Sequence, residues 1–232
     1  MKNKVVFCSA LLAGVAACGL SARAQNLIQN GGFETGDFTG WTVATESGSS
    51  GSWYVSSGYT APIAFPGWPT AGPASGTYYA VYDQNAPTAA VLLQSFTVPA
   101  GVSQVTVSFD MFVNDWHAAG PIGTGLDFYN YPNQHAQVDI LSGAAGPWDS
   151  PLDELVPPIA TPNGPYPYTP YSFNVAVTGG QTYQLRFGAV DDLWWMTVGV
   201  DDVSVTPVPD TASTLGCLGA ACIGLMVLRR RG

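Results

Sequence analysis

Residues Val105–Val113 read Val-Thr-Val-Ser-Phe-Asp-Met-Phe-Val, and this stretch decides the fold class. Every second residue from Val105 to Val113 is apolar, while Thr106, Ser108 and Asp110 fill most of the positions between them. Side chains of a β-strand alternate between its two faces, so the pattern predicts a strand with one face in a hydrophobic core. No segment between residues 25 and 206 carries the longer period of an amphipathic helix.

The same composition recurs along the chain and predicts an all-β domain. Other expected strands are 77–82, 91–98, 135–141, 171–177, 182–190 and 196–205. Gly/Pro turn chemistry follows two of them, at 98–101 and 178–181. About eight short strands favour a single β-sandwich of the jelly-roll type, with a barrel as the alternative. Two Gly/Pro-rich stretches, 47–75 and 114–170, are expected to form long loops or edge segments, because proline lacks the backbone N–H that a central strand donates to its neighbour.

The charge distribution separates the middle of the chain from its ends. Of the seven basic residues, only Arg186 lies between residues 25 and 206, against fifteen acids, which gives this part a formal charge of −14. Phosphate binding requires clustered Lys and Arg, so nucleic acid is excluded as a partner. All four cysteines (Cys8, Cys18, Cys217 and Cys222) also lie outside the middle, which excludes a disulfide framework or thiolate metal site there.

The N-terminus predicts export. Lys2 and Lys4 precede an apolar run at 5–17, and Ala22-Arg23-Ala24 supplies a small-x-small cleavage pattern, so residues 1–24 are expected to form a signal peptide. Two alternatives stay open: an uncleaved membrane anchor, and lipidation at Cys18 after the lipobox-like Val-Ala-Ala at 15–17. All three place the domain outside the cytoplasm.

The C-terminus, 207–232, predicts a sorting signal. A Val208-Pro209-Asp210 motif precedes an apolar run at 215–228, expected to be a short transmembrane helix, and the chain ends with Arg229, Arg230, Arg231 and Gly232. This order of parts resembles the PEP-CTERM-type sorting signal, and the sequence of the motif is most similar to that of the VPDSG-CTERM variant. The resemblance implies recognition and removal by a membrane-embedded exosortase in bacteria that make exopolysaccharide. A plain tail anchor, with the arginines in the cytoplasm, is the alternative.

The two ends of the middle domain carry a second resemblance. Residues 26–34 read Asn-Leu-Ile-Gln-Asn-Gly-Gly-Phe-Glu, followed by Gly40-Trp41, and residues 200–205 read Val-Asp-Asp-Val-Ser-Val. They resemble the ends of the galactose-binding-like jelly roll of carbohydrate-binding modules. The resemblance implies that the first and last strands are neighbours and that a structural calcium bridges them.

The calcium ligands implied by this resemblance are Glu34, Gly32 and Asp201. Carboxylate and backbone carbonyl oxygens are the ligands that calcium prefers. Strand alternation places Asp201 on the inward face with Val203 and Val205, where a carboxylate needs a partner. The alternatives are that Asp201 hydrogen-bonds a loop or pairs with Arg186.

Aromatic residues in the polar, Gly/Pro-rich stretches are the candidates for sugar contact, because sugars stack on flat rings with polar groups nearby. These ligand candidates are Trp116, Tyr129, Tyr131, Trp148, Tyr166 and Tyr168. Each could instead pack its loop, whereas Trp41, Phe109 and Trp195 are expected in or near the core.

Catalytic patterns are weak in this sequence. Asp153-Glu154 and Asp191-Asp192 are candidate carboxylate pairs, and in an acid-rich chain they are better explained as solvated surface groups. The only histidines, His117 and His135, lack metal-ligand spacing. The sequence thus predicts an exported, surface-anchored, non-catalytic protein that associates with extracellular polysaccharide. The alternatives are a structural matrix protein or adhesin with protein partners, and a polysaccharide-acting hydrolase.

Overall fold

The structure is a computed structural model that describes residues 25–63, 67–116, 123, 125–159, 167–193 and 195–208. The predicted signal peptide, the apolar run at 215–228 and the arginine cluster lie outside this part of the chain. Where residues are described, no helix is long and apolar enough to cross a membrane. The domain itself spans Asn26–Pro207.

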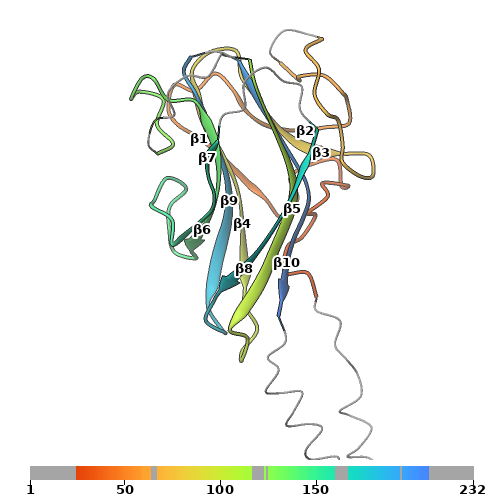
Figure 1. The fold of residues 1–232 in the computed structure, drawn as a ribbon, viewed down its shortest axis with the longest axis vertical. Helices are drawn as coiled ribbons and strands as arrows, with labels where there is room; N and C mark the ends of the chain where they lie inside the picture. The colour runs from red at the N-terminus through yellow and green to blue at the C-terminus, as the bar shows by residue number, and fades with distance from the viewer. Residues whose placement is uncertain are drawn as a thin grey trace, which may run out of the picture. The chain divides into compact units, whose positions relative to one another are not determined.

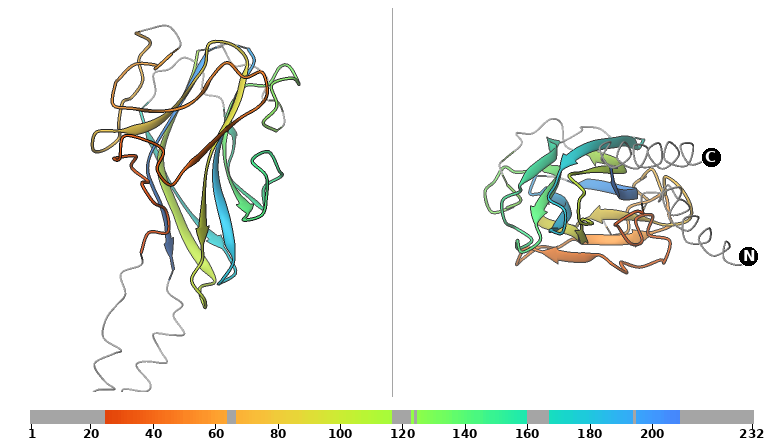
Figure 2. Two further views of the ribbon diagram at one scale, coloured as in Figure 1. Left: turned by 180° about the vertical axis from the view of Figure 1, so that it is seen from behind. Right: turned by 90° about the horizontal axis from the view of Figure 1, so that it is seen from below.

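In the described part of the chain, ten strands form two antiparallel sheets that pack face to face (Figures 1 and 2). The first sheet has the order β1 (Thr42–Thr45), β4 (Thr88–Thr97), β9 (Thr182–Asp191), β6 (His135–Ser142) and β7 (Asp153–Ile159). The second has the order β2 (Ser52–Ser56), β3 (Tyr79–Asp83), β10 (Met196–Pro207), β5 (Gln104–Asp115) and β8 (Thr169–Ala176). The predicted all-β sandwich is therefore confirmed, and the barrel alternative is not observed.

The core lies between the sheets and follows the alternation of β5. Val105, Val107 and Phe109 are buried against the facing sheet. The Phe109 ring meets the Phe187 ring of β9 edge-on, with the ring centroids 5.1 Å apart. Trp41 and Phe109 are thus in the core as expected.

The outer faces of both sheets are also partly covered, which explains why central strands are buried on both sides. Phe112 of β5 points away from the main core and packs with Tyr79 and Val81 of β3 in a small outer cluster. On the other sheet, Phe128 from the β5–β6 connection packs on Ala89 and Val190.

The two stretches expected to form long loops contain more regular structure than their composition suggests. β2 lies within 47–75, and β7 lies within 114–170 next to β6, which confirms the strand expected at 135–141. β2 and β7 are edge strands, and β7 includes Pro157 and Pro158. An edge strand leaves one side of its backbone unpaired, so proline is tolerated there.

Candidate functional site

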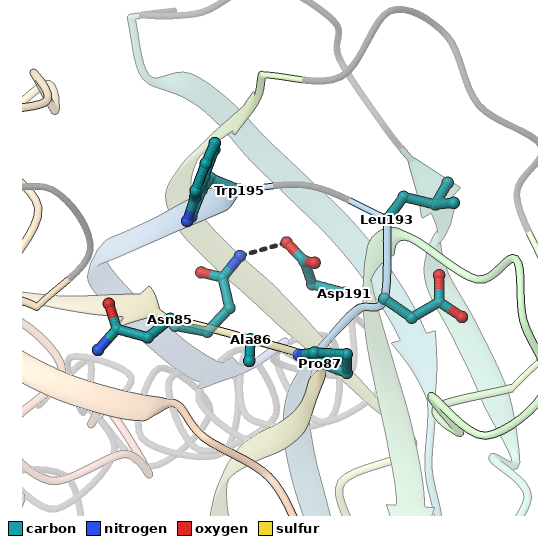
Figure 3. A pocket seen from close by; sticks show the side chains of 8 residues that line it. Asn85, Ala86, Pro87, Asp191, Leu193 and Trp195 are labelled. Carbon is teal, nitrogen blue, oxygen red and sulfur yellow. Dashed lines mark hydrogen bonds between the residues drawn. The ribbon is translucent and has the colours of Figure 1, made fainter.

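Several connections meet at the end of the sandwich opposite the last residues of β10, and we call this the distal end (Figure 1). A cavity of about 150 Å³ opens there between the β3–β4 connection and the segment that joins β9 to β10. Its lining residues are Gln84, Asn85, Ala86, Pro87, Asp191, Asp192, Leu193 and Trp195. Figure 3 shows Asp191 between Trp195 and Pro87, with Leu193 to one side.

The floor of the cavity is a buried amide–carboxyl pair. The side-chain amide of Gln84 donates to Oδ2 of Asp191. Gln84 and Asp191 are only 1% and 3% exposed. Burial, together with the charges of Asp115 and Asp192, raises the pKa of Asp191 well above its usual value. Asp191 therefore keeps its proton at a pH where a surface aspartate is ionised.

Further amides hold the acidic groups next to this pair. The Gln134 amide donates to Oδ1 of Asp115 over 2.5 Å, and its carbonyl oxygen accepts the backbone N–H of Leu193 over 3.2 Å. The backbone N–H of Asn133 donates to Oδ1 of Asp192 over 2.8 Å. The β5–β6 connection is thus bonded directly to the wall of the cavity.

Three tryptophans from three different connections gather beside the cavity. The Trp68 ring lies edge-on to Trp116, with centroids 4.5 Å apart, and to Trp195, with centroids 5.4 Å apart. The backbone N–H of Trp116 donates to the carbonyl of Trp195. Trp195, expected near the core, instead forms part of the cavity wall, and the ligand candidate Trp116 lies next to it.

Two other ligand candidates lie at the distal end on the segment 125–133. Tyr129 and Tyr131 are 65% and 70% exposed, so both rings face solvent. The Tyr129 hydroxyl donates to the carbonyl of Ser47 over 2.5 Å. The connection before β2 is bonded in turn to the cavity wall, because Ser50 Oγ donates to the carbonyl of Ala86.

The remaining ligand candidates do not line this cavity. Trp148 is 39% exposed on the β6–β7 connection, along the outer face of the first sheet. Tyr168 packs edge-on against Phe112, with centroids 5.0 Å apart, and donates its hydroxyl to the carbonyl of Gly72. Tyr168 therefore fastens a loop to the outer face of the second sheet. Tyr166 lies outside the described residues.

Asp201 lies on the opposite face of β10 from the one that alternation predicts. The pairing of β10 with β5 shifts between Asp201 and Ser204, which marks a β-bulge. Val200 and Val203 consequently both face the core, while Asp201 points outward beneath the β2–β3 connection. Its side chain is nevertheless 0% exposed.

The Asp201 carboxylate accepts three backbone hydrogen bonds. Oδ2 accepts the N–H groups of Ala74 and Ser75 over 2.9 and 3.1 Å, and Oδ1 accepts that of Asp202 over 2.8 Å. Burial still outweighs these bonds and raises the pKa of Asp201 to about 6. Of the two alternatives to calcium, hydrogen bonding to a loop is observed. Pairing with Arg186 is not, because Arg186 pairs with Asp139.

The other two predicted calcium ligands lie beside Asp201. A methyl group on Gly32 would be 3.7 Å from Asp201 Oδ1 and 3.8 Å from Glu34 Cγ. Glu34 accepts the backbone N–H groups of Thr77 and Tyr78, and the Tyr78 bond is the main reason that its pKa is lowered. No group of three His, Cys, Asp or Glu side chains able to hold a metal occurs in the described ranges.

The resemblance implied that the first and last strands are neighbours, but β1 and β10 lie in different sheets, and it is the opening segment before β1 that runs along β10. The Leu27 N–H donates to the carbonyl of Val205, and the Val203 N–H donates to the carbonyl of Gly31. A Cβ atom on Gly31 would lie 2.0 Å from the Val203 carbonyl oxygen. Glycine is therefore required where the two segments cross.

The carboxylates considered for hydrolysis fall into two different settings. Asp153 and Glu154 are exposed on edge strand β7, as expected for solvated groups. Asp191 is buried and Asp192 is half-buried at the cavity, so the expectation of surface groups is wrong for Asp191. Gln84 and Asn85 were not among the predicted site residues. The sequence feature that could have indicated them is a pair of amide side chains in a turn between two strands.

No protein-family model and no curated protein matches this chain. Among solved structures, the chain is similar to TmCBM61 in complex with β-1,4-galactotriose, with a TM-score of 0.52, 14% identity and coverage of 80% of this chain and 100% of that one. It is also similar to the enzymatically active domain of bacteriophage CBA120 tailspike protein 4, with a TM-score of 0.50, 12% identity and coverage of 79% and 21%. A further match is the K3 cleaved adhesin domain of Lys-gingipain from Porphyromonas gingivalis, with a TM-score of 0.45, 18% identity and coverage of 77% and 98%. The first likeness shows that this domain shares the β-sandwich fold of TmCBM61, and the second shows that part of the tailspike domain has a similar fold.

Proposed function

We propose that the domain is a non-catalytic glycan-binding module of an exported, surface-associated protein, and that the distal cavity is its binding site. The observation that carries the proposal is a cavity whose lining combines the indole ring of Trp195 with the polar side chains of Gln84, Asn85 and Asp191. Sugar sites combine such an apolar face with a few polar groups that accept and donate hydrogen bonds. The exposed rings of Tyr129 and Tyr131 extend the aromatic surface at the same end.

Binding rather than hydrolysis agrees with the burial of the acidic groups. Glycoside hydrolysis requires two carboxyl groups about 5–10 Å apart on either side of an accessible bond. Asp191, whose pKa is raised, is 3% exposed and has its Oδ2 occupied by the Gln84 amide. A buried and occupied carboxyl group is poorly placed to protonate a leaving group, although it can still shape a binding pocket.

The charge of the distal end indicates which glycans the site accepts. Within the described residues Arg186 is the only arginine or lysine, and it is buried in an ion pair with Asp139 and does not line the cavity. Among the described residues that line the cavity there is no arginine or lysine to pair with a uronate or sulfate group, whereas the charges of Asp115 and Asp192 lie close enough to raise the pKa of Asp191. We expect binding of uncharged glycans, such as galactose or glucose polymers, and weak binding of anionic ones.

Trp195→Ala tests the location of the site. Because an indole at the centre of a contact contributes on the order of 2 kcal/mol, this change should weaken binding to the best neutral glycan by about 30-fold. The matched control is Trp148→Ala, which removes an exposed indole from a different connection and should leave affinity unchanged. Affinity electrophoresis on a panel of neutral and anionic polysaccharides supplies the measurement. A loss with Trp148→Ala alone would move the site to the first sheet, and no binding to any glycan would favour a protein partner.

We also propose a structural calcium ion held by Glu34, Asp201 and the carbonyl of Gly32. Two observations support the fit: the Asp201 charge is buried without a neighbouring cation, and Gly32 leaves room beside its Oδ1 atom. With fewer than three suitable side chains grouped there, backbone carbonyl oxygens must complete the coordination. A bound calcium ion would keep Asp201 ionised and tie the opening segment to β10.

The terminal segments complete the proposal. Export by the signal peptide, followed by exosortase removal of the tail after Val208-Pro209-Asp210, would leave the domain at the cell surface with extracellular polysaccharide. Intact-mass measurement of the protein from the cell envelope is expected to give a mature form without residues 1–24 and without Arg229, Arg230 and Arg231. Retention of the three arginines would instead favour a simple tail anchor.

A further inference from the structure

A chain of buried polar side chains runs across the outer face of the first sheet, beneath the segment that carries Tyr129 and Tyr131. His135, at the start of β6, lies at its centre and is 0% exposed. His135 Nδ1 lies 2.9 Å from Oδ1 of Asn133, and Nε2 lies 3.0 Å from Oε1 of Gln137. Both ring nitrogens therefore face an amide carbonyl oxygen.

The orientation of the Asn133 amide is fixed by its other contacts. Its Nδ2 group donates to the carbonyls of Gly125 and Asp127 over 2.9 and 3.0 Å. Rotating the amide by 180° would place its oxygen against two backbone carbonyl oxygens, which would repel it. Asn133 must then present an acceptor to His135 Nδ1.

The Gln137 amide is fixed in the same way. Its Nε2 group donates to Oδ2 of Asp139 over 2.8 Å, and rotation would turn its oxygen toward that carboxylate. Gln137 must then present an acceptor to His135 Nε2. A neutral imidazole has one N–H and one lone pair, so it can satisfy only one of these two acceptors, whereas an imidazolium satisfies both.

We propose that His135 is a positioning residue, held as an imidazolium whose two N–H groups orient Asn133 and Gln137. Through Asn133 the ring fixes the segment 125–133 at both ends, because the same side chain bonds the carbonyls of Gly125 and Asp127. The Asn133 backbone N–H is also bonded to Asp192 on the cavity wall. The role of His135 toward a ligand rests on the proposed glycan site, but its protonation state does not.

The surrounding charges act in opposite directions on the ring. Burial is the largest of these effects and lowers the pKa of His135 overall, whereas the Gln137 hydrogen bond and the Asp139 charge raise it. The Asn133 carbonyl adds a second acceptor that only the charged ring can satisfy. The charged groups of the elements packed around His135 are Asp139 on β6, Glu154 on β7, Arg186 on β9, and Asp127 and Asp192 in the adjoining connections. We expect the second acceptor, together with the excess of acids over the single arginine, to outweigh the effect of burial.

The test is nitrogen NMR of the ring, made simple by the small number of histidines. In the full-length His117→Gln protein, His135 is the only histidine, so its two nitrogens can be followed from about pH 5 to about pH 9. The expected result is a doubly protonated ring that titrates with a midpoint above the ~6.5 of an exposed imidazole. In Gln137→Met, made in the same background, the midpoint should fall by about one unit, because one acceptor is gone. A single neutral tautomer at pH 6, or an unchanged midpoint in Gln137→Met, would overturn the proposal.

Two further measurements separate this inference from the proposed function. Amide exchange of residues 125–133, and the affinity for the best neutral glycan, should both change as pH rises through the His135 midpoint, with faster exchange and weaker binding. If the ring titrates and the segment 125–133 does not respond, the positioning role is wrong. If exchange responds while no glycan binds at any pH, the glycan site is wrong and the role of His135 stands.

Discussion

Replacing Arg186 with methionine is expected to lower the free energy of unfolding by about 3–5 kcal/mol, which is a large part of the stability of a domain of this size. Arg186 Nε and Nη2 donate to Oδ2 of Asp139 over 2.8 and 2.6 Å. Both side chains are almost completely buried, and Oδ1 of Asp139 has no hydrogen-bond partner. Without the guanidinium, Asp139 becomes a buried charge that has lost its cation and keeps the hydrogen bond from the Gln137 amide.

Arg186 also fastens the β6–β7 connection. Its Nη1 group donates to the carbonyls of Pro147 and Asp149 over 2.9 and 3.0 Å. Methionine fills a similar volume but supplies no donors, so proteolysis within residues 143–152 should become faster.

Urea unfolding of wild type, Arg186→Met and the double variant Arg186→Met/Asp139→Leu measures the effect. The double variant removes both charges, so it should recover much of the stability lost in Arg186→Met. Equal losses in the single and double variants would mean that Arg186 acts through the loop carbonyls rather than through Asp139. A loss below about 1 kcal/mol would show that water reaches Asp139 and screens its charge.

The long strands could be predicted from the sequence because their alternation records a single buried face. This holds for β5, β9 and β10, whose inward residues follow one another at every second position over most of their length. The edge strands β1, β2 and β7 are short and rich in polar residues or proline, so their pairing depends on neighbours distant in the sequence. Tertiary pairing, rather than local propensity, determines these segments.

The candidate site was harder to predict, and the reasons differ between residues. Trp195 reads as a core residue because its neighbours are apolar, yet it follows the end of β9, where the chain turns across the distal end. The bulge between Asp201 and Ser204 turns the Asp201 side chain to the other face of the sheet, and the local composition does not predict this bulge. Tyr168 has a loop-like sequence context, but it packs against Phe112, which is outward-facing and still buried. Alternation assumes one buried face, and here loops cover the second face as well.

Lowering the pH from about 7.5 to about 5 is expected to stabilise the metal-free domain through Asp201. The folded state raises the pKa of this carboxyl to about 6, against ~3.9 in an unfolded chain, so the folded state binds the proton more tightly between these values. A shift of two units corresponds to roughly 3 kcal/mol in full, and acidification to about pH 5, one unit below the folded pKa, realises about 1 kcal/mol of it after solvent screening. Asp191 acts in the same direction, because its pKa is also raised.

The Asp201 contribution can be isolated with Asp201→Asn, measured by urea unfolding at both pH values in EDTA. Asparagine does not titrate, so the variant should gain less stability on acidification than wild type, while Asp153→Asn, an exposed control, should behave like wild type.

Calcium links this titration to the proposed metal site, because an ion bound to Asp201 competes with the proton. In millimolar calcium the part of the wild-type gain that Asp201→Asn lacks should therefore disappear, and EDTA at pH 7.5 should lower the melting temperature by several degrees. A melting temperature that EDTA does not change would exclude the calcium ion. Equal pH dependence in wild type and Asp201→Asn would show that Asp201 is still ionised at pH 5. In that case the backbone hydrogen bonds from Ala74, Ser75 and Asp202 alone would hold its charge.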